Sequence, residues 1–455
     1  MIDNLAAGTV QIKTLWKHVF NFETWLILRL VAIVYQNTSY FCKGLFLTPD
    51  LLSPTRVLVF SALFPNEKTP NAGLFIRERM FRVAKNVPLV VVAPQVWSPF
   101  DWLLRFRWKT YRLQAPVFEV MDGIEVYRPR VLSIPMIFKS FDGWLMAKGS
   151  YRVCKKLVLN FKPTVIDAHF CYPAGYAASI LAQRLNLPLV ITLRGSADNR
   201  LLGTALESRL RLALTNSNKV IAVSNALKQN FASKLGLHDS KVEVIGNGVD
   251  LAKFSTVDQL TAREKLGFSA ADKVIISVGN LIQLKGFHRL IALLPRLIIQ
   301  FPTLKLLVVG GPVEGDSTAE KLKEQVQSLG LGRVVYFAGR IAPDQMKWYY
   351  GCADIFALAT AFEGWANVFL EAMACGLPVI TTQVGGNAEV VSGPNLGSLI
   401  EFWNEESALS ALTRALSCTW DIDAIKDYAR ANSWEYRVKQ VEKLLHSASS
   451  QSGFR

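Results

Sequence analysis

Residues 362–380 read FEGWANVFLEAMACGLPVI and indicate how this part of the chain folds. A short apolar run at residues 354–358 precedes the segment. Gly376 ends a helix predicted over residues 366–375, and Pro378 prevents that helix from resuming before the next apolar run. Strand, loop, helix and strand in this order are typical of a parallel α/β sheet. Glu363 then lies in the loop, and Glu371 about one turn inside the helix.

The same alternation of apolar runs and helical patterns extends along the chain. Continuous runs of this kind are typical of strands buried on both faces. They form two series, one at residues 56–62, 88–93, 164–168, 188–193 and 219–223, the other at residues 273–278, 304–309, 334–337, 354–358 and 378–381. The predicted fold is α/β, with two Rossmann-like doubly wound domains facing a cleft.

Turn residues separate the two series in IGNGVDLAKF, residues 245–254. Residues 433–445, SWEYRVKQVEKLL, predict a capped amphipathic helix near the end of the chain. We therefore predict an N-terminal apolar and basic extension at residues 1–53, a first domain at residues 54–245, a second at residues 246–430, and a helix with a tail at residues 431–455.

Composition agrees with a globular chain of two domains, since 51% of its 455 residues are hydrophobic. The formal net charge of +15 favours contact with anions such as phosphates, acidic lipid headgroups or nucleic acid. The 6 cysteines are scattered, with no CxxC pair and no zinc-ligand spacing. This pattern predicts a reducing cytosol and no metal site.

The apolar run TWLILRLVAIVY at residues 24–35 is interrupted by Arg29. It has only about half of the roughly 20 residues that a bilayer crossing needs, so it is not expected to span a membrane. Nor does a cleavage site follow it, as a secretory signal would require. Two interpretations stay open: a helix packed on the first domain, or a helix lying in a membrane interface.

Several features point to the carboxyl ends of the second series of strands, where doubly wound domains bind ligands. The helix that begins after Glu363 offers free N–H groups that bind a phosphate or diphosphate without a metal. Residues 279–286, GNLIQLKG, follow a strand and offer Lys285, while Gly310 and Gly311 follow another strand and allow close approach of a ligand.

Taken together, EGWANVFLEAMACGLPVI, GNLIQLKG and GNGVD resemble the retaining family 4 glycosyltransferases of the GT-B fold. The resemblance runs over about residues 56–446. Three upstream stretches are similar to bacterial enzymes of lipopolysaccharide, capsule and exopolysaccharide assembly: FPNEKTPNAGLFIRERM (residues 64–80), DAHFCYPAGYAA (residues 167–178) and TLRGS (residues 192–196).

The resemblance implies a role for each matched position in the second domain. Glu363, next to Gly364, contacts the hydroxyls of the donor sugar, and Glu371 accepts hydrogen bonds from the ribose of the nucleotide. Lys285 holds the diphosphate. The remaining donor-binding positions are the N–H groups around Asn367 and Val368, the loops at Asn280 and Gly310, and the YFAGR segment ending at Arg340, where the base rests.

In the first domain, the resemblance implies that His169 faces the donor sugar across the cleft. Gly73 lies in the loop that approaches the phosphates and the acceptor. One departure from the family pattern is Asn280, where many members carry arginine beside the diphosphate. Arg194 or Arg340 is expected to compensate for the absent cation.

The family also implies a front-face substitution, in which the departing phosphate helps to deprotonate the acceptor hydroxyl. Preorganised positive potential at the diphosphate stabilises that transition state, so neither a metal nor another cofactor is expected. Glu363 is then an organiser and not a nucleophile.

Aromatic and basic residues interleave at residues 97–113, WSPFDWLLRFRWKTYRL. This mixture suits a membrane interface with anionic lipid, although an amphipathic helix packed on the core or a loop over the substrate would also explain it. No nucleic-acid-binding module accompanies it, so nucleic acid is not an expected partner. We expect a cytoplasmic protein, peripheral on the inner face of the cytoplasmic membrane, with a lipid-linked or oligosaccharide acceptor.

The predicted function is retaining transfer of a sugar from a nucleotide-diphosphate sugar to a saccharide acceptor in cell-surface polysaccharide biosynthesis. Two alternatives stay open: a nucleotide-sugar epimerase of similar fold, or a non-catalytic scaffold of a polysaccharide assembly complex. A dinucleotide-dependent dehydrogenase is disfavoured, because no GxGxxG follows the first strand.

Overall fold

The computed structural model of the protein describes residues 54–70, 72–107, 111–133, 139–402 and 404–450. The chain divides into two compact units, Met1–Pro54 and Thr55–Arg455, and both large sheets belong to the second unit. The apolar run at residues 24–35 lies outside the described residues. In the described part of the chain, no helix has both the length and the apolar character that a membrane crossing requires.

The first domain, called the N-terminal lobe (residues 55–245), contains one large sheet and a two-stranded pair. Its strands are β1 Val57–Phe60, β2 Leu89–Val92, β3 Gln95–Trp97, β4 Phe118–Met121, β5 Ile124–Tyr127, β6 Arg130–Leu132, β7 Val165–His169, β8 Leu189–Leu193, β9 Lys219–Ala222 and β10 Val242–Val244. The large sheet has the order β10-β9-β8-β7-β1-β2-β5-β4, and β3 pairs with β6. Among the described strands of this lobe, β4 and β5 pair antiparallel and the others pair in parallel.

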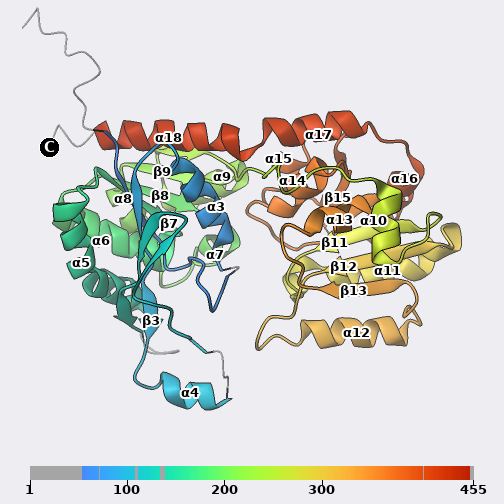
Figure 1. Ribbon diagram of the computed structural model, residues 1–455, viewed down its shortest axis with the longest axis horizontal. Coiled ribbons are helices and arrows are strands. Elements are labelled where there is room, and N and C mark those ends of the chain that lie inside the picture. The colour runs from blue at the N-terminus through green and yellow to red at the C-terminus, as the bar shows by residue number, and fades with distance from the viewer. Residues whose placement is uncertain (1–53, 71, 108–110, 134–138, 403, 451–455) are drawn as a thin grey trace, which may run out of the picture. The chain divides into compact units, whose positions relative to one another are not determined.

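Helices cover both faces of this sheet (Figure 1). The helices of this lobe are α3 Leu74–Val83, α4 Asp101–Arg107, α5 Asp142–Asn160, α6 Tyr176–Leu185, α7 Ser196–Asn199, α8 Glu207–Asn216 and α9 Asn225–Leu235, of which α4 lies apart from the sheet (Figure 1). Successive side chains of a strand point to opposite faces. Leu58 and Phe60 therefore join the core beneath α5, α6 and α8. Val57 and Val59 pack instead with the residues of α3.

The second domain, called the C-terminal lobe (residues 246–432), contains a parallel sheet. Its strands are β11 Lys273–Val278, β12 Leu304–Val309, β13 Val335–Gly339, β14 Ile355–Leu358, β15 Val379–Thr382 and β16 Gly397–Ile400, in the order β13-β12-β11-β14-β15-β16. Its helices are α10 Gln259–Leu266, α11 Phe287–Gln300, α12 Thr318–Ser328, α13 Met346–Gly351, α14 Asn367–Ala374, α15 Asn387–Val390, α16 Glu405–Ser417 and α17 Ile422–Ala431. The strand order reverses between β11 and β14, and ligands bind beyond the carboxyl ends of strands at such a point.

The last helix, α18 Trp434–Ser450, returns to the N-terminal lobe. Its buried side chains, among them Trp434, Val438 and Val441, join the core formed by β1 and α3. At the crossing, Val249 pairs with Ser433, and a Cβ on Gly248 would lie 2.6 Å from the Trp434 backbone. The two segments that connect the lobes thus run side by side. The boundary predicted at residues 245–246 lies directly after β10, and the one predicted at residues 430–431 lies in the last turn of α17; the division into domains stays a prediction.

The predicted fold class is confirmed, and each predicted apolar run overlaps one of the observed strands, although β7, β13 and β15 extend one or two residues beyond their runs. The helix predicted over residues 366–375 is α14, and the one predicted over residues 433–445 is α18. The strands that sequence reasoning missed are β3 to β6, β10 and β16. They are short, and β4 alternates between exposed and partly exposed residues, so no continuous apolar run marks them.

Candidate active site

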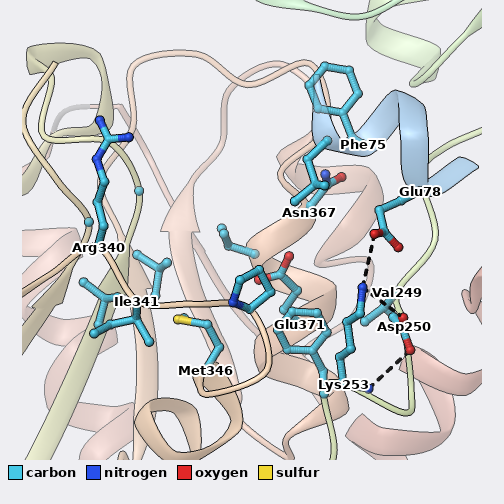
Figure 2. A pocket seen from close by; sticks show the side chains of 18 of the residues that line it. Phe75, Glu78, Val249, Asp250, Lys253, Arg340, Ile341, Met346, Asn367 and Glu371 are labelled. Atoms are coloured by element: carbon cyan, nitrogen blue, oxygen red, sulfur yellow. Dashed lines mark hydrogen bonds and ion pairs between the residues drawn. The ribbon is translucent and has the colours of Figure 1, made fainter. Parts of the chain in front are cut away.

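A cavity of about 430 Å³ lies where the start of α3 faces the carboxyl ends of the C-terminal strands. Leu74, Phe75 and Glu78 line it from α3. Figure 2 shows Glu371 and Asn367 on α14, with Arg340 at the opposite side of the cavity. The cavity coincides with the point where the strand order reverses, which is where the fold predicts a ligand.

The start of α14 supplies backbone donors to this cavity. Asn367 and Val368, its first two residues, line the cavity, and no side chain caps the helix. Ala366 before them is extended, with φ −86° and ψ 98°. The first N–H groups of a helix have no partner within it, and they carry its positive dipole end. Both residues therefore lie where the sequence places them for binding an anion.

Lys285 lines the same cavity and forms an ion pair with Glu363, Nζ to Oε1 at 2.6 Å. The Thr360 hydroxyl also donates to Glu363, at 3.1 Å. Gly286 makes the approach of the two loops possible, because a Cβ there would lie 1.8 Å from the Ala359 carbonyl oxygen. Glu363 is not among the residues that line this cavity. It lines a smaller one of about 160 Å³, together with Phe362, Gly385 and residues of α9.

Glu371 lies on the wall of the cavity formed by α14, one turn after Asn367 (Figure 2). The Tyr350 hydroxyl donates a hydrogen bond to its Oε2 at 2.9 Å. Burial raises the pKa of Glu371 to about 7, against the opposing influence of Tyr350 and Lys253. This carboxyl group therefore titrates near neutral pH, unlike an exposed glutamate.

Glycines in the loops after β11 and β12 allow the backbones of these two loops to pack closely against each other. Gly310 has φ +147°, and a Cβ there would lie 1.7 Å from the Gly279 carbonyl oxygen. Asn280 and Gly310 both line the cavity. The Arg340 guanidinium passes over Gly311 and donates to the Pro312 carbonyl at 2.7 Å. Arg340 and Lys285 both line the cavity, and compensation for Asn280 by Arg340 stays a prediction.

His169 is placed differently from the prediction that it faces the cleft. Its side chain is fully buried and is not among those lining the cavity. Arg194 approaches its Nδ1 at 3.0 Å, and because a guanidinium only donates, Nδ1 must accept. Burial, then the charges of Arg194 and Arg79, hold the pKa of His169 well below its ordinary value. The neutral ring therefore carries its proton on Nε2, 3.5 Å from the Asp167 carboxylate.

Three other predicted residues lie outside the lining of the 430 Å³ cavity. Gly73 precedes α3 with φ +70°, against the Leu63 carbonyl. Gly364 meets Gly195 across the lobes, since a Cβ on Gly364 would lie 2.3 Å from the Gly195 Cα. Arg194 points to His169 and Asn247 and not into the cavity, so it does not replace the cation missing at Asn280.

Two family models match most of the C-terminal lobe and much of the N-terminal lobe. Residues 258–432 match the model of glycosyl transferases group 1, and residues 110–253 match glycosyltransferase family 4. The chain belongs to the family 4 glycosyltransferases.

Relatives and solved structures agree with this family. A Bacillus subtilis protein named for teichuronic acid biosynthesis, the glycosyltransferase TuaC, is 28% identical over 86% of this chain and 97% of its own length. A D-inositol 3-phosphate glycosyltransferase of Corynebacterium urealyticum is 31% identical over 51% of this chain and 57% of its own. Sucrose-phosphate synthase from Thermosynechococcus elongatus has a TM-score of 0.69 at 20% identity, covering 88% of this chain and 100% of its own.

A structure of Anabaena HepE in complex with UDP has a TM-score of 0.64 at 21% identity, covering 87% of this chain and all (100%) of that one. At these identities the solved structures show that the glycosyltransferase has the GT-B fold, which was the predicted one.

Sequence reasoning missed several residues around the cavity of this glycosyltransferase. Lys253 lies between Glu78 and Asp250, with Nζ at 3.1 Å from one carboxylate and 3.5 Å from the other (Figure 2). Burial raises the pKa of Glu78, but the ion pairs with Arg82 and Lys253 together outweigh burial and bring this pKa below its ordinary value. Asp250 and Lys253 stand in the quoted turn at residues 245–254, but only the fold brings α3 against it.

Proposed function

We propose that this glycosyltransferase moves a sugar from a nucleotide-diphosphate sugar to a saccharide acceptor in the assembly of a cell-surface polysaccharide. The observation that carries the proposal is the convergence of Lys285, the start of α14 and Glu371 on one cavity. These three groups match two parts of such a donor: the cation and the N–H groups suit the diphosphate, and the carboxylate suits the ribose hydroxyls. The name of TuaC supports polysaccharide assembly, and the HepE complex supports a uridine nucleotide.

We further propose a retaining, front-face reaction without a metal. The Glu363 carboxylate forms an ion pair with Lys285. This pairing favours a role in which Glu363 orients the donor sugar over one in which it attacks that sugar. When the glycosidic bond breaks, charge grows on the diphosphate, and Lys285 with the N–H groups of α14 stabilises it. The diphosphate then accepts the proton of the acceptor hydroxyl as the new bond forms. A sugar covalently trapped on Glu363 would contradict this mechanism.

A panel of UDP-, GDP- and ADP-sugars tests the donor site through slow donor hydrolysis. We expect hydrolysis of at least one donor, and a loss of roughly 100-fold in Lys285→Met, since such electrostatic contacts supply about 2.7–4 kcal/mol. Lys323→Met is the matched control, because Lys323 is exposed on α12 and does not line the cavity. An unmodified chain that neither hydrolyses a donor nor binds a nucleotide would refute the proposal and favour a scaffold.

We also propose a lipid-linked acceptor and peripheral binding to the inner face of the cytoplasmic membrane. The support is an exposed aromatic segment on and beside α4, where Phe100, Trp102 and Phe106 are 57%, 70% and 94% exposed. Exposed basic residues also follow one another on α5 at Lys148, Arg152, Lys155 and Lys156. Exposed apolar residues that enter the headgroup region, and exposed cations that attract anionic headgroups, are typical of proteins that bind anionic membranes.

Sedimentation with vesicles tests this surface. We expect binding to vesicles containing phosphatidylglycerol at low salt, and a weaker response to phosphatidylcholine alone, because the basic residues attract anionic headgroups. The double variant Trp102→Ser/Phe106→Ser should bind less, whereas Ile299→Ser, which removes an 80% exposed apolar residue from α11, should not. Equal vesicle binding by both variants would show that α4 is not part of the membrane-binding surface.

A further inference from the structure

Asn247, in the connection between the lobes, contacts residues of both. It is 5% exposed. Its Oδ1 accepts hydrogen bonds from Arg79 at 3.1 Å and from Arg194 at 2.8 Å. Its Nδ2 donates to Oδ1 of Asn367 at 2.9 Å. A single buried carboxamide thus joins two arginines of the N-terminal lobe to the first residue of α14.

Hydrogen-bond chemistry fixes the orientation of this carboxamide. A guanidinium has donors only, so the side of Asn247 that faces Arg79 and Arg194 must be its oxygen. The opposite orientation would place an NH₂ group against two guanidinium groups. With its oxygen so engaged, Asn247 presents NH₂ to Asn367, and Asn367 must answer with its own oxygen. The NH₂ group of Asn367 is then left for the cavity that this residue lines.

The two arginines are themselves held in place. Arg79 is fully buried on α3 and also donates to the carbonyls of Ile245 and Gly246, at 3.0 and 3.2 Å. Arg194 donates to Nδ1 of His169 and lies over the Phe75 ring, 5.2 Å from its centroid. Neither guanidinium can turn away without losing buried hydrogen bonds. The orientation of Asn247 is therefore set by the N-terminal lobe.

We propose that Asn247 is a positioning residue which turns the Asn367 carboxamide so that its NH₂ group faces a phosphate oxygen of the bound nucleotide. Asn367 lines the cavity, and Figure 2 shows it beside Phe75. A phosphate oxygen only accepts, so the NH₂ orientation binds it and the reversed one repels it. The inference rests on the proposed function, because it assumes that the cavity takes a nucleoside diphosphate. It gives Arg79, Arg194 and His169 a shared role: they fix the orientation of the Asn367 carboxamide in the donor site without contacting the donor.

A double-mutant cycle between Asn247 and Asn367 tests the proposal. The probe is whichever of UDP, GDP and ADP binds the unmodified chain most tightly, together with its nucleoside. In Asn247→Asp the introduced carboxylate still accepts from both arginines but has no N–H, so Asn367 must donate to it and turn its oxygen to the phosphate. We expect the Kd for the nucleotide to rise about tenfold, as for one lost charged hydrogen bond, and the Kd for the nucleoside to stay unchanged.

The Asn367→Ala background separates this relay from the charge that the variant adds. There, Asn247→Asp should raise the Kd of the nucleotide by less than about threefold, because no carboxamide remains to be turned. An equal rise in both backgrounds would overturn the proposal, since the charge would then act directly on the nucleotide. If the unmodified chain binds none of the three nucleotides, the proposed function fails and this inference with it.

A second measurement is independent of the folding of the variant. In a crystal structure of the unmodified chain with the nucleotide, the carboxamide of Asn367 should lie within hydrogen-bond distance of a phosphate oxygen, with Asn247 still bound to both arginines. A carboxamide that contacts only hydroxyl or N–H groups of the ligand would overturn the proposal.

Discussion

The raised pKa of Glu371 makes the stability of the protein depend on pH in a way that Glu371→Gln should remove. Burial raises this pKa from the ordinary 4.5 to about 7. Below pH 4.5 the carboxyl is protonated in the folded and unfolded chains alike. Between pH 4.5 and 7 the unfolded chain releases the proton and the folded chain keeps it, so the folded state loses stability as pH rises.

The size of this loss follows from the shift. A difference of 2.5 between the two pKa values corresponds to at most about 3–4 kcal/mol, at roughly 1.4 kcal/mol for each unit of pKa. Glutamine keeps an oxygen for the Tyr350 hydroxyl but does not ionise. The free energy of unfolding of Glu371→Gln minus that of the unmodified chain should therefore increase as pH rises from 4.5 to 7. This difference should level off above pH 7.

Urea unfolding of both chains between pH 4.5 and 9 measures the effect. Tyr350→Phe is an informative control: it removes the hydrogen bond that lowers the Glu371 pKa, so the loss of stability should continue to higher pH. A difference between the unmodified chain and Glu371→Gln that does not change with pH would refute the reasoning. Glu371 would then titrate as an exposed carboxyl group does.

Two further predictions concern contacts between the lobes. Gly195→Ala should lower donor hydrolysis and raise the radius of gyration in solution, because the new Cβ would lie 2.7 Å from the Gly364 Cα. The control is Gly203→Ala, at φ +77° with nothing within 4 Å of the new Cβ, which should cost only a backbone strain of about 1–2 kcal/mol. Equal effects of the two substitutions would contradict this account. Glu389→Gln should lower the free energy of unfolding by about 1 kcal/mol and speed hydrogen exchange at Asn225 and Ala226, because their N–H groups donate to the Glu389 carboxylate at 2.6 and 2.8 Å. The control is Asp421→Asn, which alters a helix cap within the C-terminal lobe and should leave that exchange unchanged.

The order of strands and helices follows from local patterns in the sequence. The strands β1, β7 and β11 are buried at every position except Lys273, because both faces of a parallel sheet are covered, and their sequences are accordingly mostly apolar. Gly376 and Pro378 mark the end of α14 through backbone geometry that depends only on neighbouring residues. For the same reason the sequence placed Lys285, Asn367 and Glu371 at one cavity, since all three follow strands whose carboxyl ends share an edge of the sheet.

Local sequence patterns were thus sufficient to predict the two doubly wound lobes and the side of the C-terminal sheet that carries the candidate site. The folded chain was needed to show that His169 is buried beside Arg194, that Glu363 is paired with Lys285, and that Asn247 contacts both lobes. These contacts join positions 25, 78 and 120 residues apart. No local pattern encodes such contacts, because each joins residues far apart in the sequence that only the folded chain brings together.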